Sequence, residues 1–451
     1  MSESFSQALE PVPDLLDIVA ALPGQYPFLL DSAASGPLGR YSLLLRSSGE
    51  SLCLSAAGDL TGPGQGGRFL ERLNGWYQQL RRPAEAKPAL PFCGGWFIYL
   101  GYEFAAELEP VLELPPAPGG FPDALAVRCD GAIIIEHGNP DRATLVAESR
   151  RTLERMRAEL SAVGHSPSAA SLPPTARVRA EPDAQFIAAI RRVQDYLAAG
   201  DAFQVNLSRA WDIEFDGDVD PVGVYRRLRR ANPAPFAGLM LWEGRSLMSS
   251  SPERLVEVRD DLVQTRPIAG TYPRGTDEAS DLALSRDLLA HPKERAEHIM
   301  LIDLERNDLG RVCVTGSVEV SELMVVESYA HVHHIVSNVR GKLKKQATPC
   351  DVIAAVFPGG TITGCPKVRC MQIIAELEQR GRGFYTGAMG YLSRDGQMDL
   401  SILIRSLLLS GRRVSLRTGA GIVADSVPER ELAETVAKAR GMLLALEPDH
   451  A

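Results

Sequence analysis

The chain has 451 residues, which exceeds the ~250–300 residues that one hydrophobic core usually spans, so we expect two domains or one composite domain. Its formal net charge of −9 argues against a nucleic-acid partner, because phosphate binding requires a basic surface. The seven cysteines are scattered, the first residues do not resemble a signal peptide, and no apolar run approaches the ~18 residues of a membrane span. We therefore expect a cytoplasmic protein without a membrane segment.

The N-terminal part of the chain contains short runs typical of β-strands, followed by one helical segment. The runs are GRYSLLLRS, GGWFIYLGYEF and ALAVRCDGAIIIEHG, and the helix is predicted in ATLVAESRRTLERMRAELSAV. A stretch rich in Ser, Ala and Pro then indicates a linker at 166–182. We predict a β-rich N-terminal region at 1–165 and a second domain at 183–451.

The second domain opens with a predicted helix over 183–198, in which Phe186, Ile190 and Val193 keep the helical period and Gly200 suits the C-terminal cap. Strand-like runs follow as far as Gly270, and a long helix is predicted in PKERAEHIMLIDLERND. Strands come in runs with helices between them and without a regular βαβ alternation. This order favours an α+β fold over a doubly wound sheet.

Two acidic pairs in helical segments are candidates for a metal site. Glu294 and Glu297 lie in HPKERAEHIM, and Glu431 and Glu434 lie in PERELAET. A spacing of three puts both carboxylates of a pair on one helical face. Two such helices brought together would offer the oxygen ligands that Mg²⁺ prefers. Spacing alone favours the alternative, two solvated helix faces, because Glu is common on exposed helices.

Other motifs are ambiguous by themselves. GAGIVA, which begins at Gly419, has the form of a dinucleotide fingerprint without its strand–turn–helix context, so we interpret it as a turn whose amides approach a ligand carboxylate. FPGGTITGCPK leads into an amphipathic helix, and Lys367 at that entry indicates either an anion site or a capped turn. A cluster of His331, His333 and His334 is disfavoured as a metal site, because neighbours in an extended segment point to opposite faces.

Eight ordered segments resemble the chorismate-utilising enzymes. That family includes the large subunits of anthranilate synthase and aminodeoxychorismate synthase, isochorismate synthase and salicylate synthase. The resemblance covers nearly all of the chain from about residue 183. It implies an anthranilate synthase component I-like α+β fold, with antiparallel sheets layered with helices. The segments are SSSPERL, RPIAGTYPRG, AEHIMLIDLERNDLGRVC, HHIVSNVRG, FPGGTITGCPKVRCMQII, FYTGAMGY, SILIRSL and RTGAGIVADSVPERELAETVAKA.

The resemblance also implies how the substrate chorismate is held. Mg²⁺ would be bound by Glu297 and Glu434, with Glu294 and Glu431 close by or bound through water, and the ion would hold the ring carboxylate. The enolpyruvyl carboxylate would be gripped by a second group of residues, in which a planar guanidinium binds a carboxylate in a bidentate way. That group comprises Arg405, Tyr385, Lys438 and the amides of Gly419, Ala420 and Gly421.

Three further positions match catalytic roles in the family. Glu253 matches the general acid that protonates the departing C4 hydroxyl, which requires a raised pKa. His334 matches a base or electrostatic partner near the ring. Thr271 matches a residue that anchors the C4 side of the substrate.

Two positions bear on the nucleophile. Enzymes of this family that add water carry a lysine where this chain has Gln204, so the resemblance favours ammonia, which needs orientation more than deprotonation. Many aminodeoxychorismate synthases carry a lysine where this chain has Ala269, and that lysine attacks the ring first. Alanine cannot form such an adduct. This departure favours anthranilate synthase, or an aminodeoxychorismate enzyme that delivers ammonia directly.

Other features favour aminodeoxychorismate synthase component I, which makes 4-amino-4-deoxychorismate for 4-aminobenzoate and folate biosynthesis. These are the segment Asn232–Met240, Thr363 where the anthranilate type usually has serine, and the short N-terminal region. We take this as the first reading. Anthranilate synthase component I, which converts chorismate to anthranilate and pyruvate, is the alternative.

Partners follow from the same resemblance. The chain has no amidotransferase nucleophile motif, so we expect ammonia from a glutamine amidotransferase subunit or from solution. The segment from Leu29 to Leu44 resembles the tryptophan pocket of both enzyme types. A hypothesis of a different class is a non-catalytic homologue that only binds a ligand, which the retention of Glu253 beside four acidic metal candidates argues against.

Overall fold

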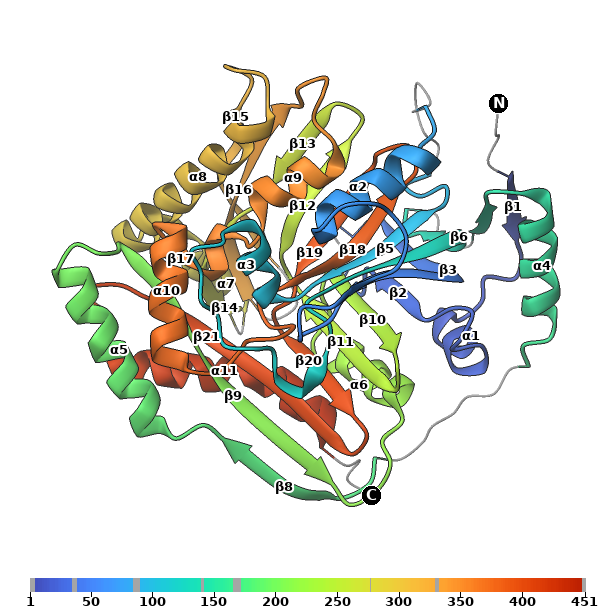
Figure 1. Ribbon diagram of the computed structural model, residues 1–451. Coiled ribbons are helices and arrows are strands. Elements are labelled where there is room, and N and C mark those ends of the chain that lie inside the picture. Colours follow the sequence, from blue (N-terminus) through green and yellow to red (C-terminus); the bar gives the residue numbers. More distant parts are fainter. Residues whose placement is uncertain are drawn as a thin grey trace.

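The computed structural model describes residues 5–34, 39–83, 90–138, 142–164, 172–275, 277–328 and 332–447 (Figure 1). Within these ranges, the side chains of Thr271, Pro273, Lys293 and Val332 are not described.

A continuous series of antiparallel pairings joins most of the strands, as the α+β prediction requires. In spatial order the series is β8 (Thr175–Ala180), β9 (Gln204–Phe215), β21 (Arg413–Ile422), β20 (Ser406–Ser410), β11 (Arg245–Ser251), β10 (Phe236–Trp242), β2 (Phe28–Asp31), β3 (Tyr41–Leu54), β6 (Ala124–Glu136), β5 (Gly95–Leu100), β18 (Ala388–Ser393), β19 (Met398–Ile402), β12 (Arg254–Arg259), β13 (Leu262–Thr265) and β16 (Val332–Lys342).

Shorter or peripheral strands extend this series. They are β1 (Phe5–Leu9) on β7 (Ala143–Ala147), which itself pairs with β6, together with β4 (Leu60–Thr61) on β3, β14 (Ile268–Pro273) and β15 (Glu319–Ser328) on β16, and β17 (Gly364–Cys365) on β9.

Strands from the N-terminal part lie inside the series formed by the C-terminal part. β2, β3, β6 and β5 stand between β10 and β18, so strands from both sides of residue 182 share one sheet system (Figure 1). Of the predicted linker at 166–182, residues 175–180 form β8, and residues 166–171 lie outside the described ranges. The two parts of the chain therefore contribute strands to the same sheet system.

Helices pack on these strands, and capping residues set where several of them begin. The predicted helix at 183–198 is confirmed as α5, and Gly200 just beyond it has a φ of +82°. The helices are α1 (Leu15–Ala21), α2 (Phe69–Leu80), α3 (Ala105–Leu108), α4 (Arg150–Ser161), α5 (Asp183–Ala198), α6 (Pro221–Ala231), α7 (Glu278–Ala290), α8 (Pro292–Val312), α9 (Pro349–Val356), α10 (Lys367–Glu378) and α11 (Pro428–Leu446), with 3₁₀ turns at Tyr102–Phe104, Pro118–Gly120 and Gly360–Ile362.

Hydrogen bonds from capping side chains explain where two of these helices begin. The Asp220 carboxylate accepts hydrogen bonds from the amides of Val222 and Gly223 at the start of α6, where Pro221 occupies the first helical position. Thr348 and Asp351 form a reciprocal capping box at the start of α9.

The helices near the later site pack against specific strands. α11 packs on β21 and α6, α10 packs on β9, and α8 packs on β14 and β16. Figure 1 shows α10 and α11 beside β9 and β21, with α8 at the upper left of the view. Through these contacts, α8 covers β14 and β16, and α11 covers β21.

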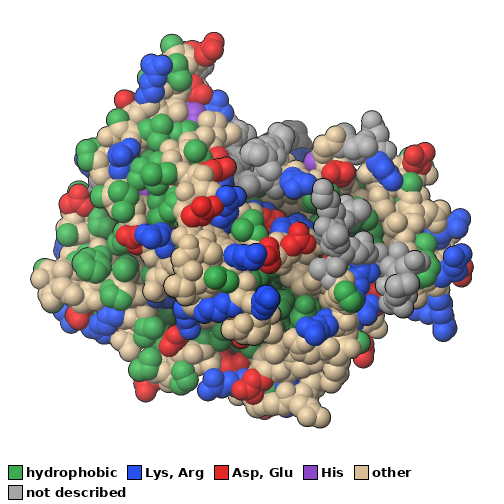
Figure 2. All heavy atoms as spheres, turned by 90° about the horizontal axis from the view of Figure 1, so that it is seen from above, with side chains coloured by type: hydrophobic (Ala, Val, Ile, Leu, Met, Phe, Trp, Pro, Cys, Tyr) green, Lys and Arg blue, Asp and Glu red, His purple; other side chains and the backbone are tan. Residues whose placement is uncertain are grey.

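The outer surface carries charges of both signs. Figure 2 shows Lys, Arg, Asp and Glu side chains interspersed over one face. No helix in the described ranges is long and apolar enough to cross a membrane.

A buried ionic cluster joins α10 to the strands beneath it. Glu378 lies between two guanidiniums, 2.7 Å from Nη2 of Arg382 and 2.7 Å from Nη2 of Arg417, and it accepts from the Ser208 amide at 2.8 Å. Burial raises the pKa of the Glu378 carboxyl, but the facing guanidiniums outweigh that effect and lower it, so the carboxylate stays charged.

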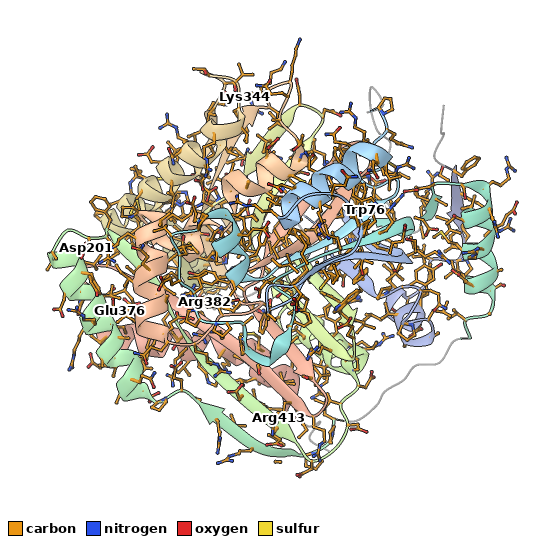
Figure 3. The ribbon with its side chains drawn as sticks, in the orientation of Figure 1. Trp76, Asp201, Lys344, Glu376, Arg382 and Arg413 are labelled. Carbon is orange, nitrogen blue, oxygen red and sulfur yellow. The ribbon has the colours of Figure 1, made fainter. Side chains whose placement is uncertain are left out.

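Replacing Glu378 by Ala should destabilise the fold by about 3–5 kcal/mol, because two buried guanidiniums would lose their counter-ion. Chemical denaturation of the two proteins measures this difference. Glu376→Ala is the control, since Glu376 is exposed on the same helix where it faces α5, and its only hydrogen-bond partner within the described ranges is the Tyr196 hydroxyl (Figure 3). An equal loss in both variants would contradict the argument.

Candidate active site

A cavity of about 140 Å³ lies between β9, β21 and α11. Six residues that the sequence singled out line it: Glu253, His334, Tyr385, Arg405, Gly419 and Lys438. A neighbouring cavity of about 530 Å³ shares His334, Arg405 and Lys438 with it. Segments that are far apart in the chain thus meet around one space.

Glu253 is held by the strands on either side of it. It lies between β11 and β12, its amide donates to Ser251 Oγ at 3.2 Å, and its carbonyl accepts from the Ile402 amide at 3.0 Å. Its side chain is 5% exposed, and burial raises the pKa of the carboxyl to about 7. A large share of the carboxyl is therefore protonated at neutral pH, as a general acid requires.

His334 on β16 presents a neutral imidazole to the cavity. Its Nδ1 lies 3.3 Å from the Gly270 carbonyl oxygen, which can only accept, so Nδ1 carries the proton and Nε2 is the acceptor. Burial lowers the pKa of His334 to about 4. The adjacent His333 faces away, toward Ser328 and Asp281, while His331 lies outside the described residues.

Arg405 and Tyr385 form a donor-rich wall. Arg405 has a φ of +52°, an uncommon backbone conformation for a residue other than glycine. Burial lowers the pKa of its guanidinium and raises the pKa of the Tyr385 hydroxyl to about 12, so Tyr385 keeps its proton at neutral pH. A guanidinium and a phenol hydroxyl side by side suit a carboxylate ligand.

Lys438 on α11 connects the helix to β21. Its Nζ donates to the Gly419 carbonyl at 2.9 Å and pairs with Glu434 Oε1 at 2.6 Å. The prediction of a turn at Gly419 is wrong, because the pairing of β21 with β9 continues as far as Ile422. In that strand, Ala420 turns its side chain to the core and is fully buried.

The positions that bear on the nucleophile lie at strand ends. Gln204 begins β9, and its side chain lies over Gly421 on β21. Ala269 is half-buried on β14 opposite Ile335. Thr271 pairs with His334 in the same ladder, and its side chain lies outside the described part of the chain.

The four candidate metal ligands lie on two helices, α8 and α11, and do not form a compact cluster. Glu434 is tied to Lys438, and a Cβ placed on Gly270 would lie 2.9 Å from Glu294 Oε2. Glu297 and Glu431 are half-buried. Among the residues described, no three His, Cys, Asp or Glu side chains lie close enough to hold a metal ion together. Mg²⁺ binding stays a prediction, for which the carboxylate donors have suitable chemistry.

Four polar residues that line the cavity were not predicted from the sequence: Asn206, Thr361, Arg417 and Thr418. The period-two rule of strands would have found two of them. Asn206 shares a face with Gln204, and Arg417 shares a face with Gly419. Thr361 belongs to a 3₁₀ turn, which gives no comparable periodic signal.

The predicted tryptophan-pocket segment lines a separate cavity of about 80 Å³. Leu30, Asp31, Ser32 and Tyr41 form one wall, and Pro235 lies on another. Positions 35–38 of the segment are outside the described residues. Tryptophan binding there stays a prediction.

The family model described as chorismate binding enzyme matches residues 56–444. This chain belongs to that family. The match includes every residue named above around the 140 Å³ cavity.

Individual relatives support the same assignment. A protein of Synechocystis sp. named "Anthranilate synthase component I-like protein" is 42% identical over 79% of this chain and 74% of its own length. "Anthranilate synthase component 1" of Thermus thermophilus is 39% identical over 93% of this chain and 92% of its own length. The crystal structure of anthranilate synthase component I from Streptococcus pneumoniae has a TM-score of 0.78 and 32% identity, and the match covers 90% of this chain and 93% of that one. The predicted anthranilate synthase component I-like fold is confirmed.

The protonation of Glu253 can be tested directly. We expect the infrared difference spectrum of wild type against Glu253→Gln to show a protonated-carboxyl band that disappears with a midpoint near pH 7, because burial disfavours the carboxylate. The difference is needed because burial also raises the pKa of Glu103 to about 7 and that of Glu305 to about 8. A midpoint near the ordinary value of 4.5 would rule out this assignment.

Proposed function

We propose that this protein is an anthranilate synthase component I, which aminates chorismate with ammonia and releases anthranilate and pyruvate. The observation that carries the proposal is the Thermus thermophilus relative of that name, which matches over 92% of its own length. Alanine at position 269, which cannot form a covalent adduct with the ring, agrees with it. The names of these relatives favour this activity over the aminodeoxychorismate reading.

Chorismate is a dicarboxylate, and the cavity offers cationic and hydroxyl donors. Arg405, Tyr385 and Lys438 would bind the enolpyruvyl carboxylate, since a half-buried guanidinium and a protonated phenol can satisfy two carboxylate oxygens. The same cavity is lined by Glu253, whose carboxyl is partly protonated at neutral pH. The ring would then lie between an anion-binding wall and a proton donor.

The first reaction is an exchange of hydroxyl for amine. The nitrogen lone pair of ammonia would attack C2 while the C4–O bond breaks, and the Glu253 proton would pass to the departing oxygen, which leaves as water. Glu253 becomes a carboxylate and the new amine carries the positive charge, so charge is conserved. The carboxyl must enter this step protonated, which its burial favours.

The second reaction makes the ring aromatic. A base removes the proton from C2, the bond from the ring to the enolpyruvyl oxygen breaks, and the released enolpyruvate takes up a proton on carbon to become pyruvate. Neutral His334, with Nε2 as acceptor, has the required state at neutral pH. The anthranilate ring retains the amine and the carboxylate.

Mg²⁺ is part of this proposal. Glu297 and Glu434 would hold the ion, with Glu294 and Glu431 close by or bound through water, and Glu434 would have to leave its ion pair with Lys438. When bound, the ion supplies positive charge for the ring carboxylate.

The proposal also includes a partner subunit and a regulatory ligand. The relatives are named component 1, and we propose that a glutamine amidotransferase supplies the ammonia. We also propose that the 80 Å³ cavity, which is lined by residues of β2, β10 and β12, binds tryptophan.

Aminodeoxychorismate synthase is the second candidate. Asn232, Pro233 and Ala234, from the segment that resembles that type, line the cavity of about 530 Å³ beside the site. Thr363 carries less weight, because it is fully buried and its hydroxyl bonds to the Gly359 carbonyl at 3.0 Å. The residue type at position 363 therefore reflects the packing of this loop more than contact with a ligand.

Incubation of the protein with chorismate, MgCl₂ and an ammonium salt should release anthranilate directly, detected by its fluorescence and mass. Aminodeoxychorismate, revealed as 4-aminobenzoate after addition of its lyase, would instead establish the second candidate. No consumption of chorismate under either condition would indicate a non-catalytic homologue.

Removal of the metal ligands should abolish this turnover. We expect Glu297→Ala and Glu434→Ala to lose at least about 100-fold in kcat/KM at fixed MgCl₂, because coordination by several carboxylates determines Mg²⁺ affinity. Glu429→Ala is the control, since Glu429 is exposed in the first turn of α11. Full activity of either metal-site variant would remove that residue from the metal site.

A further inference from the structure

Two amide side chains on β9 have buried oxygens that lack hydrogen-bond partners. These are Oε1 of Gln204 and Oδ1 of Asn206, and no group in the described ranges donates to either. A buried acceptor without a donor destabilises a folded protein, so such atoms are uncommon. Residues two apart in a strand share one face, so both amides point to the same side of β9.

The facing strand leaves room for both amides by having glycine opposite them. A Cβ on Gly421 would lie 2.3 Å from Gln204 Nε2. A Cβ on Gly419 would lie 2.9 Å from Asn206 Oδ1 and 2.7 Å from the Tyr385 hydroxyl. A side chain at either glycine would collide with one of these amides.

The backbone of Asn206 is fixed on both sides. Its amide donates to the Thr363 carbonyl at 2.9 Å, and its carbonyl accepts from Arg382 Nη2 at 2.7 Å. Arg382 belongs to the buried cluster around Glu378. The side-chain amide of Asn206 is therefore presented to the cavity from a rigid strand.

An unpartnered acceptor in this cavity suits a ligand that donates. Arg405, Lys438 and Tyr385 are donors and suit the substrate carboxylates, which an amide oxygen would repel. In the proposed reaction two ligand groups carry donors, the ring hydroxyl and ammonia. Glu253 is assigned to the hydroxyl, which leaves ammonia and its three N–H bonds.

We propose that Asn206, together with Gln204, binds the attacking ammonia through the two unpartnered amide oxygens and so orients its lone pair toward the ring. This inference rests on the proposed function and adds the site of the nitrogen donor. Two acceptors and no base are appropriate there, because ammonia needs orientation and no deprotonation before it attacks. Asn206 is then a determinant of nucleophile choice that complements Gln204.

The test is Asn206→Leu, which keeps the side-chain size and removes the acceptor. With ammonium chloride varied at fixed pH and saturating chorismate, we expect the KM for ammonia to rise about tenfold, which corresponds to one hydrogen bond lost. The KM for chorismate should stay within about twofold. Asn74→Leu is the matched control, because Asn74 on α2 also has a buried unpartnered amide oxygen but does not line the cavity.

Gly421→Ala provides a second variant in case Asn206→Leu does not fold. The three atoms nearest to the added methyl all belong to the flexible Gln204 side chain, so the backbone can stay in place. We expect this variant also to raise the KM for ammonia, and by a larger factor than any change in the KM for chorismate.

These measurements distinguish a failure of the ammonia site from a failure of the proposed function. An active wild type whose KM for ammonia is unchanged in both variants would overturn the ammonia site alone. A rise in the KM for chorismate with an unchanged KM for ammonia would assign the amides to the ring hydroxyl and also overturn it. A wild type that does not aminate chorismate would overturn the proposed function, and the ammonia site with it.

Discussion

The register between β9 and β21 is the constraint on which the site depends. Ten consecutive antiparallel pairs, from Arg413 opposite Glu214 to Ile422 opposite Val205, determine which side chains face the cavity. Because strand side chains alternate, this register places Arg417 and Gly419 with Asn206 on one face and sends Ala420 to the core. A slip of one residue would exchange the two sets. The ion cluster around Glu378 bonds to both strands, through Ser208 and Arg417, and opposes such a slip.

Burial then divides the cavity groups into charged and neutral sets. Arg405 and Lys438 carry positive charge, whereas the Glu253 carboxyl is partly protonated and His334 is uncharged at neutral pH. The same loss of solvent has opposite effects on an acid and a base, since it disfavours whichever form is charged. An acid that keeps its proton and a base that lacks one are thus produced by one physical cause. Both are what an exchange of hydroxyl for amine followed by proton removal requires.

Within this family the shared fold does not decide the product, and few side chains distinguish the reactions. By resemblance to the family, Gln204 stands where enzymes that add water have a lysine, and Ala269 stands where enzymes that form a covalent adduct have one. Asn206 adds a second acceptor on the same strand face as Gln204. In the proposed reaction, hydrogen-bond polarity would therefore select the nucleophile, and the carboxylate-binding residues Arg405, Tyr385 and Lys438 would not take part in that choice.

The sequence by itself determined the family, the α5 helix and the opposite directions of His333 and His334, because each depends on local period or on motifs that lie within one segment. Only the tertiary structure decided that β2, β3, β6 and β5 lie between β10 and β18, that Gly419 to Gly421 form a strand, and that Asn206 faces the same cavity as Lys438. Strand pairing over hundreds of residues is selected by burial on both faces of the sheet, and a local pattern does not identify the partner strand. The four metal ligands show the same limit. Their spacing within each helix can be read from the sequence, but the distances between the two pairs depend on how α8 and α11 pack.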